Sequence, residues 1–170
     1  EIVVVVRELD AGFPGRLADF VEEVGVGLPV VEVEPVGDAR RERGEVFREL
    51  DRAAQTGGGR WVFVSGDAAL AETSTALPAA AAKQFGRLDT IVHSAGGPAP
   101  GTVLAIDPAD WMQAFAVHVH SAFHLFRAMH PLLARAGGSV TLLSSAAALR
   151  GCPGTVAYQV VKASLIQLAR

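Results

Sequence analysis

The strongest chemical signal in this sequence comes from Ser145, Tyr158 and Lys162. Tyr158 and Lys162 are four residues apart, which on a helix places both side chains on one face, about a turn from each other. A phenol is a poor base at neutral pH, but an adjacent ammonium favours its ionised form. Tyr158 could then act as general acid or base on a carbonyl or hydroxyl group. Ser145, thirteen residues earlier, could hydrogen-bond the same oxygen while a nicotinamide ring exchanges the hydride. The alternative is a half-buried aromatic beside a solvated lysine.

Composition limits the classes of protein to which this chain can belong. It has 170 residues, 50% of them hydrophobic and 19% charged, with a net charge of −3 and a mean hydropathy of +0.31. These values predict one globular domain, and they argue against intrinsic disorder and against an electrostatic nucleic-acid binder. No apolar stretch approaches about 18 residues, so we expect no membrane span, and the start lacks a basic signal-peptide region. Cys152 is the single cysteine, which excludes an internal disulfide and fits a cytoplasmic location.

The hydrophobic pattern alternates short β-rich runs with longer helical runs. The strands are expected at residues 2–6, 30–34, 61–65, 88–93 and 139–143, and the helices at 15–24, 39–54, 68–85, 108–135 and 157–170. We expect the helix at 68–85 to bend at Pro78, and Asp107 to cap the helix that starts at Pro108. Such alternation requires crossovers, which predict an α/β fold with a doubly wound, Rossmann-like parallel sheet and helices on both faces. Ligands of such sheets bind at the carboxyl ends of the strands.

Several segments together resemble the short-chain dehydrogenase/reductase family, especially its carbonyl-reducing members related to oxoacyl carrier-protein reductases. Residues 85–97 are similar to that family's fourth strand and its N-N-A-G motif, and 111–131 to its long interface helix. Residues 138–145 are similar to a fifth strand ending in the catalytic serine, followed by Tyr158 and Lys162 at the family's spacing. The resemblance runs from about Trp61 to the end of the chain and is weaker before it.

The resemblance implies roles for these residues. The tyrosine is the proton donor or acceptor, the serine orients the substrate oxygen, and the lysine holds the nicotinamide ribose and tunes the tyrosine. The family's asparagine, which supports a water and proton relay to the lysine, is replaced at that position by His118. An imidazole can also donate, accept and hold a water, although it is bulkier and titrates near neutrality. Ala95 and Gly96, in the N-N-A-G segment, are expected to border the cofactor.

The segment after the first strand departs from the family's T-G-x-x-x-G-x-G pattern. Gly12 alone is in register, while Gly15 comes one residue late and Glu8 brings a carboxylate in place of a glycine. These glycines let backbone N–H groups approach a pyrophosphate, which an inward-facing Glu8 would repel, whereas Arg7 could compensate. Two outcomes stay open at this point: the loop binds the nucleotide, or it keeps only the strand and helix architecture.

Other polar residues bear on the cofactor. Asp67 resembles the family's acidic residue near the adenine, and it could equally be a helix N-cap before Ala68. Glu34, at the end of the second strand, would accept hydrogen bonds from ribose hydroxyls and favours NAD over NADP. Arg40 and Arg41 could instead meet a 2′-phosphate, so the preference is not settled by the sequence.

The histidines and the apolar surface of the long helix suggest further sites. His120 and His124 share a helix face, but no nearby Cys, Asp or Glu completes a metal-binding set, so we predict no metal. Cys152 has no paired histidine and is interpreted as a small apolar residue. The helix at 108–135 is apolar over much of its circumference, which predicts a homo- or hetero-oligomer through that helix.

Two functions are consistent with these observations. The first is an NAD(P)-dependent oxidoreductase of a small carbonyl/alcohol substrate, with Ser145, Tyr158, Lys162 and His118 in the catalytic site. The second is a non-catalytic partner subunit with the same fold, suggested by Glu8, Pro14 and His118. Since the family continues past this last helix with another strand, a lid and a final edge strand, we expect residues 1–170 to form a single domain that is incomplete at its C-terminus.

Overall fold

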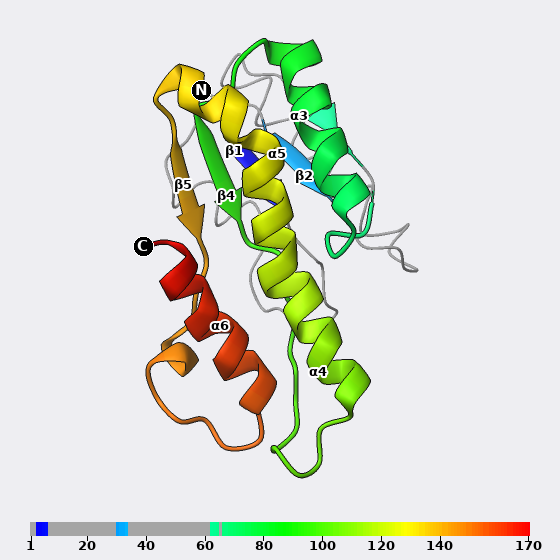
Figure 1. The fold of residues 1–170 in the computed structure, drawn as a ribbon, viewed down its shortest axis with the longest axis vertical. Coiled ribbons are helices and arrows are strands. Elements are labelled where there is room, and N and C mark those ends of the chain that lie inside the picture. The colour runs from blue at the N-terminus through cyan, green and yellow to red at the C-terminus, as the bar shows by residue number, and fades with distance from the viewer. Residues whose placement is uncertain (1–2, 7–29, 34–61, 65) are drawn as a thin grey trace, which may run out of the picture.

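Within the residues that the structure describes, the sheet has five parallel strands that follow the order β3-β2-β1-β4-β5 (Figure 1). The computed structural model describes residues 3–6, 30–33, 62–64 and 66–170. The strands are β1 (Val3–Val6), β2 (Val30–Val33), β3 (Val62–Phe63), β4 (Thr90–His93) and β5 (Ser139–Leu142). Because β1 lies between β2 and β4, the chain turns from one half of the sheet to the other between β3 and β4.

The register of the strands aligns their carboxyl ends. Val6, His93 and Leu142 are paired across β1, β4 and β5. The predicted α/β class with a parallel sheet is therefore confirmed, with strand ends within two residues of those expected. The helices expected at 15–24 and 39–54 lie outside the described residues.

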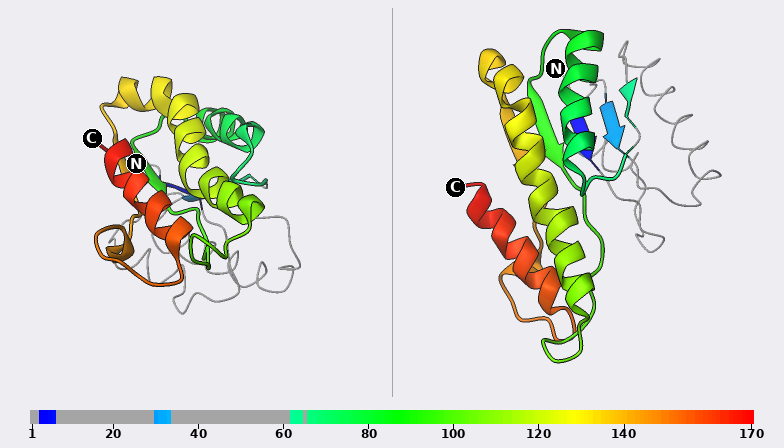
Figure 2. Two further views of the ribbon diagram at one scale, coloured as in Figure 1. Left: turned by 60° about the horizontal axis from the view of Figure 1, so that its bottom comes forward. Right: turned by 45° about the vertical axis from the view of Figure 1, so that its right-hand side comes forward.

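The helices in the described part of the chain lie side by side, α3 against α5 and α4 against α6 (Figure 2). Their bounds are α3 (Ala71–Phe85), α4 (Pro108–Phe115), η1 (Ala116–His120), α5 (Ser121–Ala136), η2 (Ala146–Ala148) and α6 (Val156–Leu168). The long helix expected at 108–135 is present, but it contains a π-helical segment, η1, between α4 and α5. Asp107 caps α4 as predicted, since its Oδ1 accepts a hydrogen bond from Ala109 N at 2.7 Å.

Helix α3 begins three residues later than predicted, so Asp67 does not cap it. Asp67 Oδ1 instead accepts a hydrogen bond from Ala69 N at 2.8 Å, and its carbonyl accepts one from Leu70 N at 3.0 Å. These bonds close a turn before the helix, and Leu70 is the N-cap. Pro78 lies inside α3, which runs as one helix past it; a bend at that residue remains a prediction.

The main hydrophobic core lies between the sheet and the two helices α3 and α5. Its largest side chains are fully buried, and they come from α3, from β4 and the segment just before it, and from α5: Leu77, Leu88, Ile91, Leu125 and Met129. Burying each such side chain contributes about 1.5–3 kcal/mol. This packing fixes β4 against α5, and thereby the residues that follow β4.

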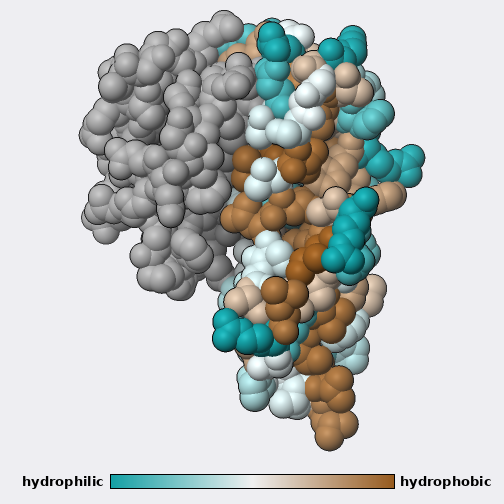
Figure 3. Space-filling view, turned by 90° about the vertical axis from the view of Figure 1, so that its left-hand side faces the viewer, coloured by the Kyte–Doolittle hydropathy of each residue, from teal (hydrophilic) through white to brown (hydrophobic). Residues whose placement is uncertain are grey.

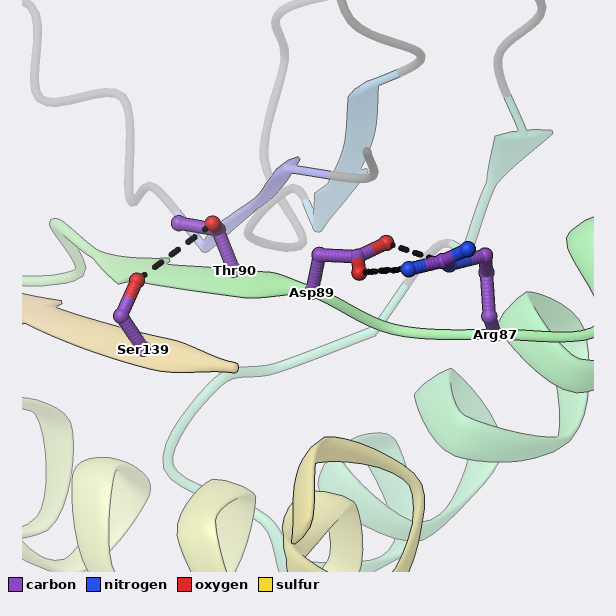
Figure 4. Close-up of polar contacts among 4 residues, drawn as sticks. All are labelled: Arg87, Asp89, Thr90 and Ser139. Carbon is purple, nitrogen blue, oxygen red and sulfur yellow. Dashed lines mark hydrogen bonds and ion pairs between the residues drawn. The ribbon is translucent and has the colours of Figure 1, made fainter. Parts of the chain in front are cut away.

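Polar contacts mark the opposite, amino-terminal ends of β4 and β5 (Figure 4). Arg87 Nη2 and Nε lie 2.5 and 2.9 Å from the two carboxylate oxygens of Asp89, and this hydrogen bonding lowers the pKa of Asp89. Thr90 Oγ1 and Ser139 Oγ are 3.5 Å apart across the two strands. The amide of Ser139 also donates to the carbonyl of Asp89 at 2.8 Å, so pairing of the two strands starts here.

Hydrophobic surface covers part of the side of the molecule that carries β5 and α6 (Figure 3). Val140 in β5 is 41% exposed, and Val160 and Leu168 in α6 are also exposed. Within the described residues β5 pairs with β4 alone. In the same part of the chain, every helix is too short or too polar to cross a lipid bilayer.

Candidate active site

Tyr158 and Lys162 lie in α6, beside the carboxyl ends of β4 and β5. Lys162 Nζ is 5.7 Å from the centre of the Tyr158 ring, so the structure brings the two side chains together as their spacing predicts. The Tyr158 ring packs against a small apolar cluster that includes Ala99, Ala114 and Val161. This packing holds the ring between α4 and α6 and leaves it partly exposed.

Lys162 is anchored to the end of β5 by two hydrogen bonds. Its Nζ donates to the carbonyl of Leu143 at 2.7 Å, and its own backbone carbonyl accepts from Ser144 Oγ at 2.8 Å. The side chain is 6% exposed, and this burial lowers the pKa of Lys162 to about 8. The Lys162 ammonium near the phenol ring is therefore largely desolvated, and it loses its proton at a lower pH than an exposed lysine does.

His118 lies in the π-helical segment η1 and also contacts the Tyr158 ring. The two rings meet edge to face, with centroids 5.7 Å apart and an interplanar angle of 82°. His118 Nε2 lies 3.0 Å from the carbonyl oxygen and 3.2 Å from the amide nitrogen of Gly97, so it donates to the first or accepts from the second, depending on the tautomer. Burial, with the positive charge of Lys162, lowers the pKa of His118 to about 4. The ring is neutral at pH 7.

Gly96 permits this arrangement because the His118 ring packs directly on its backbone. Gly96 has a φ of +151°, and a Cβ placed on it would lie 2.2 Å from His118 Cε1. Both observations exclude any larger residue without movement of the ring or the loop. Ala95, the preceding residue, is buried.

Ser145 begins the 3₁₀ turn η2, which packs against α6. Its Oγ accepts a hydrogen bond from Ala147 N at 3.2 Å. In the described part of the chain, neither the Ser145 hydroxyl proton nor the Tyr158 hydroxyl makes a hydrogen bond, so both can bind an external oxygen.

The loop between η2 and α6 is held to α6 by Gln159. Its Oε1 accepts from Cys152 N at 3.0 Å, and its Nε2 donates to the Cys152 carbonyl at 2.6 Å. The Cys152 thiol is free and partly buried. A second contact joins the loop before α4 to the start of α6, where Gly101 N donates to the Gly154 carbonyl at 2.7 Å. Two loops are thus fixed next to Tyr158.

The structure does not assemble all the predicted site residues. Asp67 follows β3, and its side chain caps the turn that it begins. Among the described residues, this side chain makes no hydrogen bond to Tyr158, Lys162 or His118. Gly12, Glu34 and the glycine-loop residues Glu8 and Pro14, together with Arg7, Arg40 and Arg41, lie outside the described residues. The described residues therefore include the nicotinamide half of the expected site, and most of the adenine half lies outside them.

His120 and His124 do not join a metal-binding set in the part of the chain that is described. No cluster of three or more His, Cys, Asp or Glu side chains that could hold a metal ion occurs among those residues. His120 is exposed, while His124 lies edge to face with Phe123 at 5.4 Å between ring centroids.

His93 is a residue of the site that the sequence interpretation missed. It is the last residue of β4, fully buried, and its Nε2 lies 2.7 Å from Ser121 Oγ. Burial, with the charge of Lys162 and the neighbouring His118, lowers the pKa of His93 to about 3. A histidine directly after the apolar pair Ile91 and Val92 was the available signal, because a buried polar group needs a partner.

Comparison with known proteins agrees with this geometry. The profile of a family described as enoyl-(acyl carrier protein) reductase matches residues 38–170. The chain belongs to the short-chain dehydrogenase/reductase family. It is 35% identical over 127 residues to an uncharacterized oxidoreductase of Mycobacterium tuberculosis, covering 72% of this chain and 48% of that protein. It is 31% identical over 169 residues to an uncharacterized oxidoreductase of Thermotoga maritima, covering 99% of this chain and 63% of that protein.

Solved short-chain dehydrogenase structures share the fold. A short-chain dehydrogenase from Mycobacterium smegmatis superposes with a TM-score of 0.79 at 24% identity, covering 99% of this chain and 68% of that one. The chain therefore has the Rossmann-like fold of this family, as the sequence predicted. It spans about half to two thirds of the length of the relatives described above.

The site around Tyr158 fits the nicotinamide half of a dinucleotide. Lys162 uses one of its N–H groups on Leu143, which leaves donors for ribose hydroxyls. The Tyr158 hydroxyl is free of bonds within the described residues, and Gly96 keeps the β4 loop close to the protein interior. These features suit a ligand with a planar ring and hydroxyl groups at the carboxyl end of β4.

Proposed function

We propose that this short-chain dehydrogenase/reductase is an NAD(P)-dependent oxidoreductase that interconverts a carbonyl and an alcohol on a small molecule. The observation that carries the proposal is that the Tyr158 ring contacts both the Lys162 ammonium and the His118 imidazole, with Lys162 Nζ and the His118 ring centre each 5.7 Å from its centre. The Tyr158 hydroxyl makes no hydrogen bond in the described part of the molecule. Such a phenol, at the carboxyl end of a parallel sheet, is suited to proton transfer.

Each residue of the site would have its own role in the transfer of a proton to and from the substrate oxygen. Tyr158 gives a proton to the substrate oxygen in reduction and takes it back in oxidation. Ser145 donates its unpaired hydroxyl proton to the same oxygen and orients it. The Lys162 ammonium stabilises negative charge on the phenol oxygen electrostatically. His118, neutral at pH 7, would use its buried Nδ1, which has no partner in the described residues, to hold a water.

A nicotinamide cofactor would supply the hydride. Lys162 and the backbone around Ala95 and Gly96 would hold its nicotinamide ribose, and Gly12 and Asp67 would hold its adenosine half. Glu34 favours NAD, because a carboxylate accepts bonds from ribose hydroxyls and repels a 2′-phosphate. The oxidoreductase names of both curated relatives support a redox reaction.

Cofactor binding and turnover test this proposal together. Calorimetry of the full-length protein with NADH and NADPH should give binding of at least one, with NADH the tighter. Turnover of a panel of small ketones should fall by about 10²–10⁴-fold in Tyr158→Phe, because only the proton-transferring group is removed. Ser164→Ala is the control variant in the same helix α6, because Ser164 Oγ donates to the Val160 carbonyl at 2.9 Å and should not change turnover. If neither NADH nor NADPH bound, the proposed oxidoreductase function would be rejected.

A non-catalytic partner subunit is the second candidate. It is supported by His118, whose Nε2 is already occupied by Gly97 at the position where the family has its relay asparagine. Glu8 in the glycine loop supports it as well. In that case the long helix would dock on an active homologue, and Tyr158→Phe would leave the activity of the purified complex unchanged.

The long helix is also the proposed contact of a homo-oligomer. Met112 and Phe123, on α4 and α5, are 59% and 43% exposed. Replacing both by Ser should lower the sedimentation coefficient of an oligomer toward that of a monomer. An unchanged coefficient would place the oligomer contact elsewhere.

A further inference from the structure

The π-helical segment η1 has a bonding pattern that involves its neighbour, Ser121. The backbone N–H of Ser121 donates to the Ala116 carbonyl, five residues back, as a π turn requires. The Val117 carbonyl, four residues back, is thereby left without its usual helical donor. Ser121 supplies one from its own side chain, since its Oγ donates to the Val117 carbonyl. Ser121 is 1% exposed, so no bulk water could replace that bond.

The protonation state of His93 follows from this bond. Ser121 has one hydroxyl hydrogen, and that hydrogen points to Val117. At the 2.7 Å contact between His93 Nε2 and Ser121 Oγ, the imidazole must therefore be the donor. The ring is the neutral Nε2–H tautomer, and its Nδ1 is buried without a hydrogen-bond partner in the described residues. His93, Ser121 and Val117 form one directed chain from β4 to the π turn.

The same residue connects to the other side of the site through its backbone. The His93 carbonyl accepts from Leu143 N at 3.1 Å, and the Leu143 carbonyl accepts from Lys162 Nζ at 2.7 Å. His93 is thus connected through Ser121 to the turn that carries His118, and through Leu143 to Lys162. The side chains of His118 and Lys162 both contact the Tyr158 ring.

We propose that His93 is a positioning residue, whose Nε2–H holds Ser121 on Val117 and so fixes the π turn that places His118 against Tyr158. A π turn adds one residue to the helix, and each residue of a helix turns the side chains by about 100°. If the turn relaxed to α-helical bonding, His118 would leave the face of Tyr158. The kinetic part of this inference rests on the proposed oxidoreductase activity, while its structural part does not.

Three variants of the full-length protein separate the hydrogen bond from the volume of the ring. His93→Gln keeps an N–H donor at the position of Nε2, His93→Leu removes the donor at similar volume, and Ser121→Ala removes the hydroxyl. Ser74→Ala is the matched control, because Ser74 is buried to a similar degree in α3. The primary readout is the ring ¹⁵N and ¹H resonances of His118, assigned by their loss in His118→Asn.

We expect Ser121→Ala and His93→Leu to shift the His118 resonances. Both variants should also lower kcat by about ten- to a hundredfold, with less than about a twofold change in KM, because a misplaced group loses orientation and not substrate affinity. His93→Gln and Ser74→Ala should match the wild type in both. His118 resonances unchanged in Ser121→Ala would overturn the inference. A loss of kcat in His93→Gln as large as that in His93→Leu would also overturn it, because the loss would then not depend on the N–H donor.

Failure of the proposed activity gives a different result. If the wild type shows no turnover but Ser121→Ala still shifts the His118 resonances, the positioning role holds and the oxidoreductase proposal fails. If His93→Leu does not fold, Ser121→Ala and His93→Gln decide the question through the same resonances.

Discussion

Replacing Gly96 by alanine tests the packing of His118 on the β4 loop, and its magnitude can be worked out from the structure. The φ of +151° is unfavourable for any residue with a Cβ, which costs about 1–3 kcal/mol. The new Cβ would lie 2.2 Å from His118 Cε1, and overpacking of this kind costs a further 1–3 kcal/mol, roughly. We expect Gly96→Ala to lower the free energy of unfolding by about 2–6 kcal/mol.

Two other glycines separate these contributions. Gly86 has a φ of +78°, and nothing lies within 4 Å of the position that a Cβ would take, so Gly86→Ala should show the backbone cost alone, roughly 1–2 kcal/mol. Gly151 has open space and no unfavourable φ, so Gly151→Ala should change stability by less than about 0.5 kcal/mol. Urea unfolding of the full-length protein, with the slope m compared between variants, measures all three.

A double-mutant cycle assigns the steric part to His118. In a His118→Ala background the ring is gone, and Gly96→Ala should lose only its backbone cost, giving a coupling of about 1–3 kcal/mol. Zero coupling, or a Gly96→Ala protein as stable as Gly86→Ala, would refute the packing of the ring on this glycine.

Three further predictions follow from the site. Because the folded pKa values of His93 and His118, about 3 and 4, lie below the ordinary 6.5, the unfolded chain binds more protons in acid. Stability should therefore fall as pH drops from about 6.5 toward 4, by up to about 1.4 kcal/mol per pH unit for each histidine, and His93→Gln should flatten the slope in urea titrations. The folded pKa of Lys162, about 8, is likewise below its ordinary value of 10.5. The free energy of unfolding of the wild type, relative to that of Lys162→Met, should therefore rise between pH 8 and 10.5, by up to about 3 kcal/mol. A difference between the two proteins that does not change with pH would contradict burial of the ammonium. Gln159→Ala should release the loop at Cys152 and speed amide hydrogen exchange there by at least roughly tenfold, without changing exchange in α3. Equal protection of the loop in the variant and the wild type would show that other contacts hold it.

The order of strands and helices from β3 onward was predictable because apolar runs and turn residues alternate clearly there. Tyr158 and Lys162 were predictable as neighbours for a similar reason: a spacing of four has one meaning on a helix. The predicted start of α3 was wrong because an Asp in this position can cap either a helix or an isolated turn, and Asp67 caps a turn that ends before the helix begins.

The π turn and the role of His93 could not be predicted. The π segment AVHVH carries Val117 and Val119 between the apolar residues on either side of it, so nothing in the periodicity shows the extra residue. The contact of His93 with Ser121 joins residues 28 apart in the sequence, which only the pairing of β4 with the long helix brings together. The direction of Lys162 toward a backbone carbonyl likewise depends on the end of β5.

The parallel pairing of β4 with β5 also sets when the site can form during folding. The His93 carbonyl accepts from Leu143, and Leu143 in turn accepts from Lys162, so three segments distant in the chain meet only after β5 has docked beside β4. Parallel pairs need a long crossover, here α4 through α5, and contacts of high sequence separation form slowly. Helix α6 can therefore be helical before Lys162 is desolvated. Recovery of the depressed lysine pKa should lag behind the recovery of helical circular dichroism in refolding.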